Sequence, residues 1–291
     1  MRASKGTRIR AKVLFLAFVA LFAWAQMLSA QTVLKVGVST EPASLDPQYS
    51  TTGATQQASQ QIFETIVTRS QNLRMSPSLA LTWKEIDPLK WELKLRQGVK
   101  FHDGKEFGSD DIVFSIKRIP GVPDSPSSYK RNVAAIKDVV AVDKYTVHIL
   151  LKNPSPSLPI DLSFIYVLPS TTPAGATVDD FNKGKYVNGT GPFKFVEWVR
   201  GDRLVVEKNN EYWGQKSSFD KVIFRPITND PSRVAALLAG DVDIIDNVSP
   251  VDQERLRKDP RVNVVSKPGV TLMYIHMDSD RDQSPQISGK N

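Results

Sequence analysis

The 291-residue sequence contains no cysteine. Disulfide bonds are therefore excluded, as are a lipid anchor on an N-terminal cysteine and a zinc site with thiolate ligands. The folded chain must instead be held together by an ordinary hydrophobic core, and its length allows one large core or two modest ones.

Histidine is scarce, and no catalytic motif is present. His102, His148 and His276 are far apart and lack the spacing of a zinc site, so no metal site is predicted. The sequence contains no G-x-S-x-G elbow, no phosphate-binding loop and no dinucleotide-binding glycine pattern. These absences predict a protein that is not an enzyme and needs no cofactor. A secreted hydrolase whose catalytic groups meet only in space is the alternative that remains open.

Long hydrophobic runs are absent after the first thirty residues. Five basic residues precede one apolar run, VLFLAFVALFAWA, at positions 13–25. Thirteen residues are short for a membrane span, which needs about 20, but suit the core of a signal peptide. We therefore predict a signal peptide over residues 1–30, cleaved after Ala30 or after Ala25, and an exported protein without stable membrane insertion. An uncleaved N-terminal anchor is the alternative.

The net charge of +7 comes mainly from this leader. Residues 1–30 hold five of the 38 basic residues and none of the 31 acidic ones, which leaves a net charge of +2. A nearly neutral chain gives no reason to expect a nucleic-acid partner.

Alternating and continuous apolar patterns predict strands along the rest of the chain. In WELKLR, Trp91, Leu93 and Leu95 are expected on the buried face. The expected strands cover residues 33–38, 91–96, 145–151, 242–246, 262–266 and 271–278, with a hairpin formed by 190–199 and 203–209.

Helices are predicted from periodicity and capping residues. IFETIV, residues 62–67, places four apolar side chains on one helical face, and Ser109 is expected to cap a helix whose first turn carries two aspartates. Asp230 and Ser249 are expected to cap two further helices, the first ended by Gly240. Mixed helices and strands indicate an α/β or α+β class.

Two polar features invite a functional interpretation. His102 and Asp103 in KFHDGKEFGSDD suggest a metal site, a catalytic pair or a turn, and the turn is favoured because each polar residue there has a local structural role. The carboxylates of GDVDIID, residues 240–246, form a possible cluster, but flanking a strand is the simpler interpretation.

Aromatic residues fall into two groups. Trp91 and Trp198 belong to strand patterns and are expected in the core. Tyr49 and Tyr129 lie in polar, proline-flanked loops, where contact with a ligand is the better expectation.

Several segments, taken in order, resemble the family 5 extracellular solute-binding proteins, the dipeptide- and oligopeptide-binding components of ABC importers. The segments are STEPASLDPQ, WELKLRQGVKFHDGKEFGSDDIVFSIKR, NGTGPFKFVEWVRGD, NNEYWG, FDKVIFRPITND and ALLAGDVDIID. Each is weak alone, but the ordered set covers nearly all of the chain after residue 30.

The resemblance implies an α/β, periplasmic binding protein-like fold of the class II type, with two lobes joined by a hinge. Residues 31–262 would be lobe I, with 31–75 and 188–262 as its core part and 76–187 as an outer subdomain. Residues 263–291 would begin a truncated lobe II. The carboxylate that holds the amino terminus of a peptide would then lie in the missing lobe.

The resemblance also implies the ligand-contacting residues. The loop after the first strand lines the cleft in this family, which indicates Glu41 and Ala43, then Thr51, Thr52 and Gly53. Tyr129 resembles an aromatic that lobe I directs toward the cleft. The alternative for residues 51–53 is a helix N-terminus with a threonine cap, and both interpretations can hold together because helix N-termini bind anionic groups.

The implied function is the capture of short peptides in the periplasm and their delivery to the permease subunits of an ABC importer. The expected protein is a monomer that binds by hinge closure and performs no catalysis. Other ligands taken by the family are the alternative: nickel chelates, haem, opines and oligosaccharides.

Overall fold

The computed structural model describes residues 31–70, 72–126 and 128–267. The predicted signal peptide and the strand expected at 271–278 lie outside the described residues. The chain forms two compact units, one ending at Asn247 and one beginning at Val248. No helix among the described residues is both long and apolar enough to cross a membrane.

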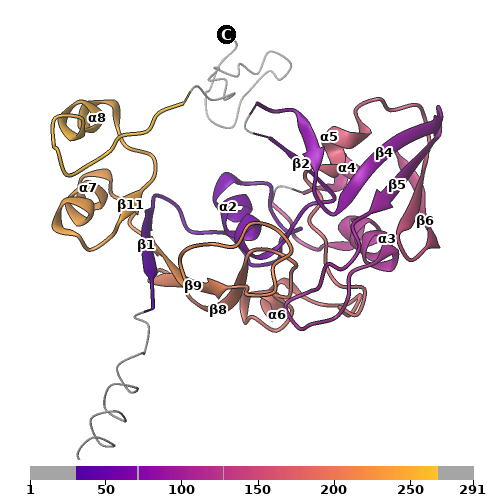
Figure 1. The fold of residues 1–291 in the computed structure, drawn as a ribbon, viewed down its shortest axis with the longest axis horizontal. Coiled ribbons are helices and arrows are strands. Elements are labelled where there is room, and N and C mark those ends of the chain that lie inside the picture. The colour runs from indigo at the N-terminus through magenta and orange to yellow at the C-terminus, as the bar shows by residue number, and fades with distance from the viewer. Residues whose placement is uncertain (1–30, 71, 127, 268–291) are drawn as a thin grey trace, which may run out of the picture. The chain divides into compact units, whose positions relative to one another are not determined.

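A mixed five-stranded sheet is built around the first strand (Figure 1). The order is β11 (Ile244–Ile245), β1 (Val33–Val38), β10 (Lys221–Pro226), β9 (Arg203–Lys208) and β8 (Phe193–Val199). β1 pairs in parallel with both neighbours, whereas β10, β9 and β8 are antiparallel. The predicted first strand and the predicted hairpin are thereby confirmed.

A second, four-stranded sheet is antiparallel throughout. Its order is β4 (Ala80–Asp87), β5 (Lys90–Leu95), β7 (Thr146–Leu151) and β6 (Ile136–Asp143). Trp91, Leu93 and Leu95 are buried on one face of β5, as predicted, and α3 (Ser109–Arg118) packs against β6 and β7. A short hairpin, β2 (Val67–Arg69) and β3 (Met75–Pro77), accompanies this sheet.

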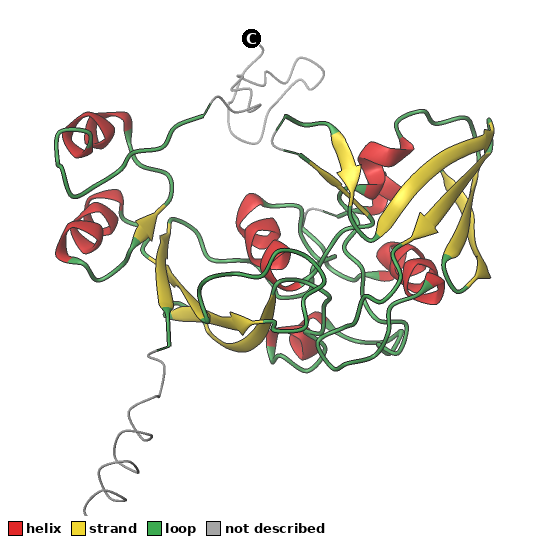
Figure 2. Cartoon of the chain, viewed as in Figure 1, coloured by secondary structure: helices red, strands yellow, loops and turns green. Residues whose placement is uncertain are grey.

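The first unit also contains several helices, drawn in red in Figure 2. They are α2 (Gly53–Ile62), α3, the 3₁₀ turn η1 (Ile119–Gly121), α4 (Lys130–Val133), α5 (Leu158–Leu162), α6 (Val178–Asn182) and α7 (Asp230–Ala239). The second unit contains α8 (Pro250–Leu256).

The helix predicted at 62–67 is wrong. α2 begins at Gly53 and ends at Ile62, and Phe63 is already extended. β-Branched residues follow, and their backbone enters sheet-like pairing: Ile66 N donates to the carbonyl of Ile165, and Ala80 N donates to that of Ile66. The apolar periodicity came from packing of an extended segment into the core.

Two predicted N-caps are displaced by one residue. Gly108 caps α3, and its amide donates to Asp111, so Ser109 is the first helical residue. Asn229, not Asp230, caps α7, because its side chain accepts from the amide of Ser232. The Ser249 cap of α8 is confirmed.

Gly240 ends α7 as predicted, with a left-handed φ of 80°. The carboxylates beyond it flank a strand: Asp243 accepts from the amide of Lys35 at 2.7 Å, and Asp246 accepts from that of Ser39 at 2.7 Å. Residues 262–266 form no strand, which corrects that prediction. None of residues 262–266 is buried, so no packing holds a strand there.

Buried apolar side chains form two separate cores. One is drawn from residues 66–167 and lies against the four-stranded sheet. The other is drawn from residues 36–63 and 166–222 and lies against the five-stranded sheet. From the β1–α2 loop, residues 39–52, Leu45 belongs to the second core.

Candidate ligand-binding site

A buried ion pair holds the β1–α2 loop. Arg118 at the end of α3 donates to both carboxylate oxygens of Asp46, at 3.0 and 2.6 Å, and to the amide oxygen of Gln48 at 3.0 Å. The Arg118 side chain is 5% exposed and that of Asp46 is fully buried. A bidentate pair of this kind fixes orientation as well as charge. Sequence reasoning missed it, because the two residues are far apart and neither belongs to a motif.

Glu41 fastens the loop to the β8–β9 hairpin. Its Oε1 accepts from Trp198 Nε1 at 2.9 Å and from the amide of Gly201 at 3.1 Å. Arg200 lies over the Trp198 ring and donates to the carbonyl of Ala43 at 3.2 Å. Trp198 is half-buried against the second core, so its role is both packing and orientation of Glu41.

The amino end of α2 is open on one side. Ala43, Thr52 and Gly53 are exposed and Thr51 is partly exposed. Thr52 is the N-cap of α2 but makes no side-chain cap hydrogen bond. A side chain at Gly53 would meet no atom within 4 Å, so the backbone there can be approached closely. Unsatisfied amides at a helix N-terminus suit a carbonyl or carboxylate.

Hydroxyl groups beneath this surface form a chain. Ser50 Oγ donates to Thr52 Oγ1, which donates to Thr55 Oγ1, both at 3.1 Å. Thr55 Oγ1 in turn accepts from the amide of Ala43 at 3.1 Å. The chain ties the two ends of the β1–α2 loop together.

Tyr129 is only 1% exposed. Its hydroxyl donates to the carbonyl of Ser50 at 3.2 Å, and burial raises its pKa. In this arrangement Tyr129 supports the loop from below. Tyr49 is partly exposed, and its carbonyl accepts from the hydroxyl of Ser125. The structure thus gathers the sequence-predicted residues on and under one loop, and contact of each with a ligand stays a prediction.

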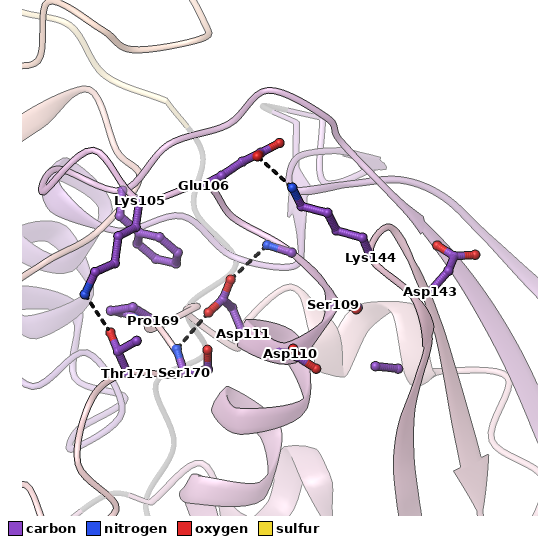
Figure 3. A pocket seen from close by; sticks show the side chains of 13 residues that line it. Lys105, Glu106, Ser109, Asp110, Asp111, Asp143, Lys144, Pro169, Ser170 and Thr171 are labelled. Carbon is purple, nitrogen blue, oxygen red and sulfur yellow. Dashed lines mark hydrogen bonds and ion pairs between the residues drawn. The ribbon is translucent and has the colours of Figure 1, made fainter.

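Part of the stretch KFHDGKEFGSDD lines a pocket of about 430 Å³ at the start of α3 (Figure 3). Asp111 accepts from the amides of Gly108 and Ser170, at 2.8 and 2.7 Å. Lys144 pairs with Glu106 at 2.6 Å, and Lys105 donates to Thr171 at 3.4 Å. These contacts within the wall agree with the structural role predicted for this stretch.

The described histidines have local partners. His102 Nε2 lies 3.0 Å from the carbonyl of Gly191, and His148 Nε2 lies 3.3 Å from Glu92. Burial lowers the pKa of His102 to about 4. In the part of the chain that the structure describes, no three His, Asp or Glu side chains are grouped to hold a metal ion.

A family model for the bacterial extracellular solute-binding proteins, family 5, matches residues 74–285. The curated oligopeptide-binding protein AppA of Bacillus subtilis is 30% identical over 249 residues, which are 83% of this chain and 45% of AppA. The chain spans about half the length of the curated relatives it matches.

Solved structures give the same picture of the fold. DppA of Helicobacter pylori, in complex with the peptide STSA, has a TM-score of 0.69 at 28% identity, covering 79% of this chain and 50% of DppA. AgaA of A. tumefaciens R10, in complex with agropinic acid, has a TM-score of 0.71 at 31% identity, covering 78% of this chain and 46% of AgaA.

Proposed function

The chain belongs to the bacterial extracellular solute-binding proteins of family 5, and on this premise we propose that it captures short peptides and delivers them to the permease subunits of an ABC importer. The fold is that of the periplasmic binding proteins, α/β as predicted. The proposed mechanism is reversible enclosure of the ligand, without covalent chemistry.

The observation that carries this proposal is the similarity to peptide-binding relatives. AppA is named for oligopeptides, and DppA was solved with the peptide STSA. The geometry of the β1–α2 loop is compatible with that role, because it presents open backbone at Gly53 and hydroxyls on a fixed support.

The proposed roles of individual residues follow from their exposure. Thr51, Thr52 and Gly53 would offer hydrogen-bond partners to the peptide backbone. Glu41 would hold the loop in the shape that presents them, since its carboxylate is already engaged by Trp198 and Gly201. Closure of two lobes would exclude water and strengthen each polar contact.

We further propose a monomer exported to the periplasm by the leader at residues 1–30. Residues 31–262 would form lobe I, with 76–187 as its outer subdomain. The two separate cores support a division of this kind, although the first compact unit ends earlier, at Asn247.

An opine is the second candidate ligand class. AgaA, solved with agropinic acid, is 31% identical to this chain, as similar as AppA. An opine is therefore tested beside the peptides.

A thermal-shift experiment on the protein in its full natural length tests the proposal. The probes are the tetrapeptide Ser-Thr-Ser-Ala, a nonapeptide pool and agropinic acid. A peptide at 100 times its Kd should stabilise the fold by about 2.7 kcal/mol, and mass spectrometry should recover it intact. Stabilisation by agropinic acid alone would replace the peptide with an opine, and peptide cleavage would refute the binding mechanism.

A further inference from the structure

Residues 189–191, Gly-Thr-Gly, lie directly against the carboxyl end of α2. The amide of Gly191 donates to the carbonyl of Ile62, the last residue of α2, at 2.9 Å. A Cβ added to Gly189 would lie 2.0 Å from that carbonyl oxygen, and one added to Gly191 would lie 2.7 Å from its carbon. We call residues 189–191 the Gly-Thr-Gly joint. Only glycine allows its backbone to approach the helix end so closely.

His102 holds this joint from the other side with both ring nitrogens. Nε2 lies 3.0 Å from the carbonyl of Gly191, and Nδ1 accepts from the amide of Gly189 at 3.4 Å. The backbone amide of His102 adds a third bond, to the carbonyl of Gly189 at 2.9 Å. An imidazole that accepts at Nδ1 and donates from Nε2 must be neutral.

A second set of contacts fixes the middle of the joint. Thr190 Oγ1 donates to Glu64, two residues beyond α2, at 2.8 Å. Glu64 also accepts from Tyr212 at 3.0 Å and from Trp213 at 2.8 Å. The joint therefore connects the end of α2 to His102, which follows β5, and through Glu64 to Tyr212 and Trp213, which follow β9. The opposite end of α2 carries Thr52 and Gly53.

We propose that His102 is a positioning residue for ligand binding: in its neutral form it clamps the Gly-Thr-Gly joint behind α2 and so fixes the exposed amino end of that helix. The inference rests on the proposed function only in assigning the ligand to that end. It predicts that protonation of His102 loosens α2, because a proton on Nδ1 would face the amide hydrogen of Gly189.

The charged groups around the clamp set the direction of the pH response. Lys194, which donates to the His102 carbonyl at 3.1 Å, disfavours the imidazolium, whereas Asp103 favours it. Burial raises the pKa of Glu64, against the opposing effect of Arg96. Acid pH thus weakens the contacts of the joint through protonation of His102 and strengthens them through protonation of Glu64. A variant of His102 is needed to separate the two effects.

Hydrogen–deuterium exchange of residues 53–62, measured without ligand at pH 7 and pH 4.5 in the full-length protein, tests the clamp. After correction for intrinsic exchange, wild-type protection should fall about tenfold or more at pH 4.5. His102→Phe should lose about tenfold already at pH 7, the size expected for lost buried hydrogen bonds. His102→Gln, which keeps a donor and an acceptor but cannot titrate, should restore protection at pH 7 and show a smaller fall at pH 4.5.

Two further variants keep the test decisive if His102→Phe does not fold. Thr190→Val, which removes one hydroxyl from the joint, should reduce α2 protection, and Thr190→Ser should restore it. His148→Gln, in β7 and without a contact to the joint, is the matched control and should match wild type. Unchanged α2 protection in the Thr190→Val and His102→Phe variants, or a full pH response in His102→Gln, would overturn the clamp.

Binding of the tetrapeptide Ser-Thr-Ser-Ala, followed by calorimetry at pH 7, separates the two proposals. If wild type binds it, Thr190→Val should bind about tenfold more weakly and Thr190→Ser like wild type. If wild type binds no peptide while the exchange results hold, the clamp stands and the peptide assignment fails. Peptide binding unaffected by a loosened α2 would refute the positioning role.

Discussion

At the scale of single residues, the Asp46–Arg118 ion pair is the contact of the β1–α2 loop that we expect to be most sensitive to mutation. Both side chains are almost fully buried, and removal of one partner leaves an uncompensated charge in the interior. Such a change costs about 3–5 kcal/mol, whereas replacing both partners with apolar residues can be nearly neutral. The pair therefore specifies the path of the loop more than it adds stability.

We predict that Asp46→Ala lowers the free energy of unfolding by about 3–5 kcal/mol. Chemical denaturation with urea measures this loss. Asp46→Leu combined with Arg118→Met should recover most of it, and Lys117→Met combined with Asp138→Leu, on an exposed pair, serves as the control. A loss below about 1 kcal/mol, the usual value for surface pairs, would contradict the importance assigned to this contact.

At the scale of elements, the contact between α2 and the Gly-Thr-Gly joint is set by backbone atoms. An added methyl group at Gly189 meets the carbonyl oxygen of Ile62 at 2.0 Å, which backbone displacement alone can relieve. A change of side-chain rotamer cannot relieve this overlap, because the obstructing atom is a backbone oxygen in the last turn of a helix.

Gly189→Ala is accordingly expected to destabilise the fold by about 3 kcal/mol or more, beyond the usual range for overpacking. Thermal unfolding followed by circular dichroism gives the change. Gly175→Ala is the matched control, because its added Cβ meets nothing within 4 Å. Equal melting temperatures for the two variants would show that the joint moves freely.

The elements also show what sequence patterns could and could not predict. WELKLR was recognised because alternation reports a half-buried strand directly, and Trp91, Leu93 and Leu95 are indeed buried. IFETIV was misjudged because a short apolar run is compatible with either period. The predicted cap, Asp230, differs by one residue from the observed cap, Asn229, because Asn and Asp are both good caps. Local patterns predicted the element type correctly where the alternation or the capping signal was strong, as in WELKLR, but not for short apolar runs such as IFETIV. The ends of the elements depended on tertiary contacts.

The candidate site was less accessible to sequence reasoning. Glu41 and residues 51–53 came from the family resemblance, and the loop that carries them is present as expected. The partners that shape the loop, Arg118 and Trp198, are 72 and 157 residues distant from Asp46 and Glu41. No local pattern encodes such pairings, since they depend on how the sheets are assembled.

At the scale of the whole molecule, stability should depend on pH through His102. Burial lowers its pKa from 6.5 to about 4. Between these pH values His102 is protonated in the unfolded chain and neutral in the folded chain. The contribution is therefore complete above about pH 6.5 and is lost as pH falls toward 4, by about 1–3 kcal/mol. Burial raises the pKa values of Glu64 and Asp111, which offsets part of the loss.

Urea midpoints at pH 7, 5.5, 4 and 3 measure this dependence. Wild type should lose more stability than His102→Gln between pH 6.5 and 4, and the two curves should run parallel below pH 4. Identical curves throughout would indicate that the imidazole is already solvated in the folded protein. His148→Gln is again the control.

The strand order of the five-stranded sheet determines when the sheet can form during synthesis. Among the described residues, the strands that pair with β1 are β10 and β11, both of which come late in the sequence. The amide of Thr32 likewise donates to Asp220, which is 188 residues further along the chain. During most of synthesis, the strands that pair with β1 have not yet been made. Pairing between segments so distant in sequence is also slow. The amino-terminal segment should therefore remain extended and accessible on the nascent chain until the hairpin of β8 and β9 and the strand after it have been made.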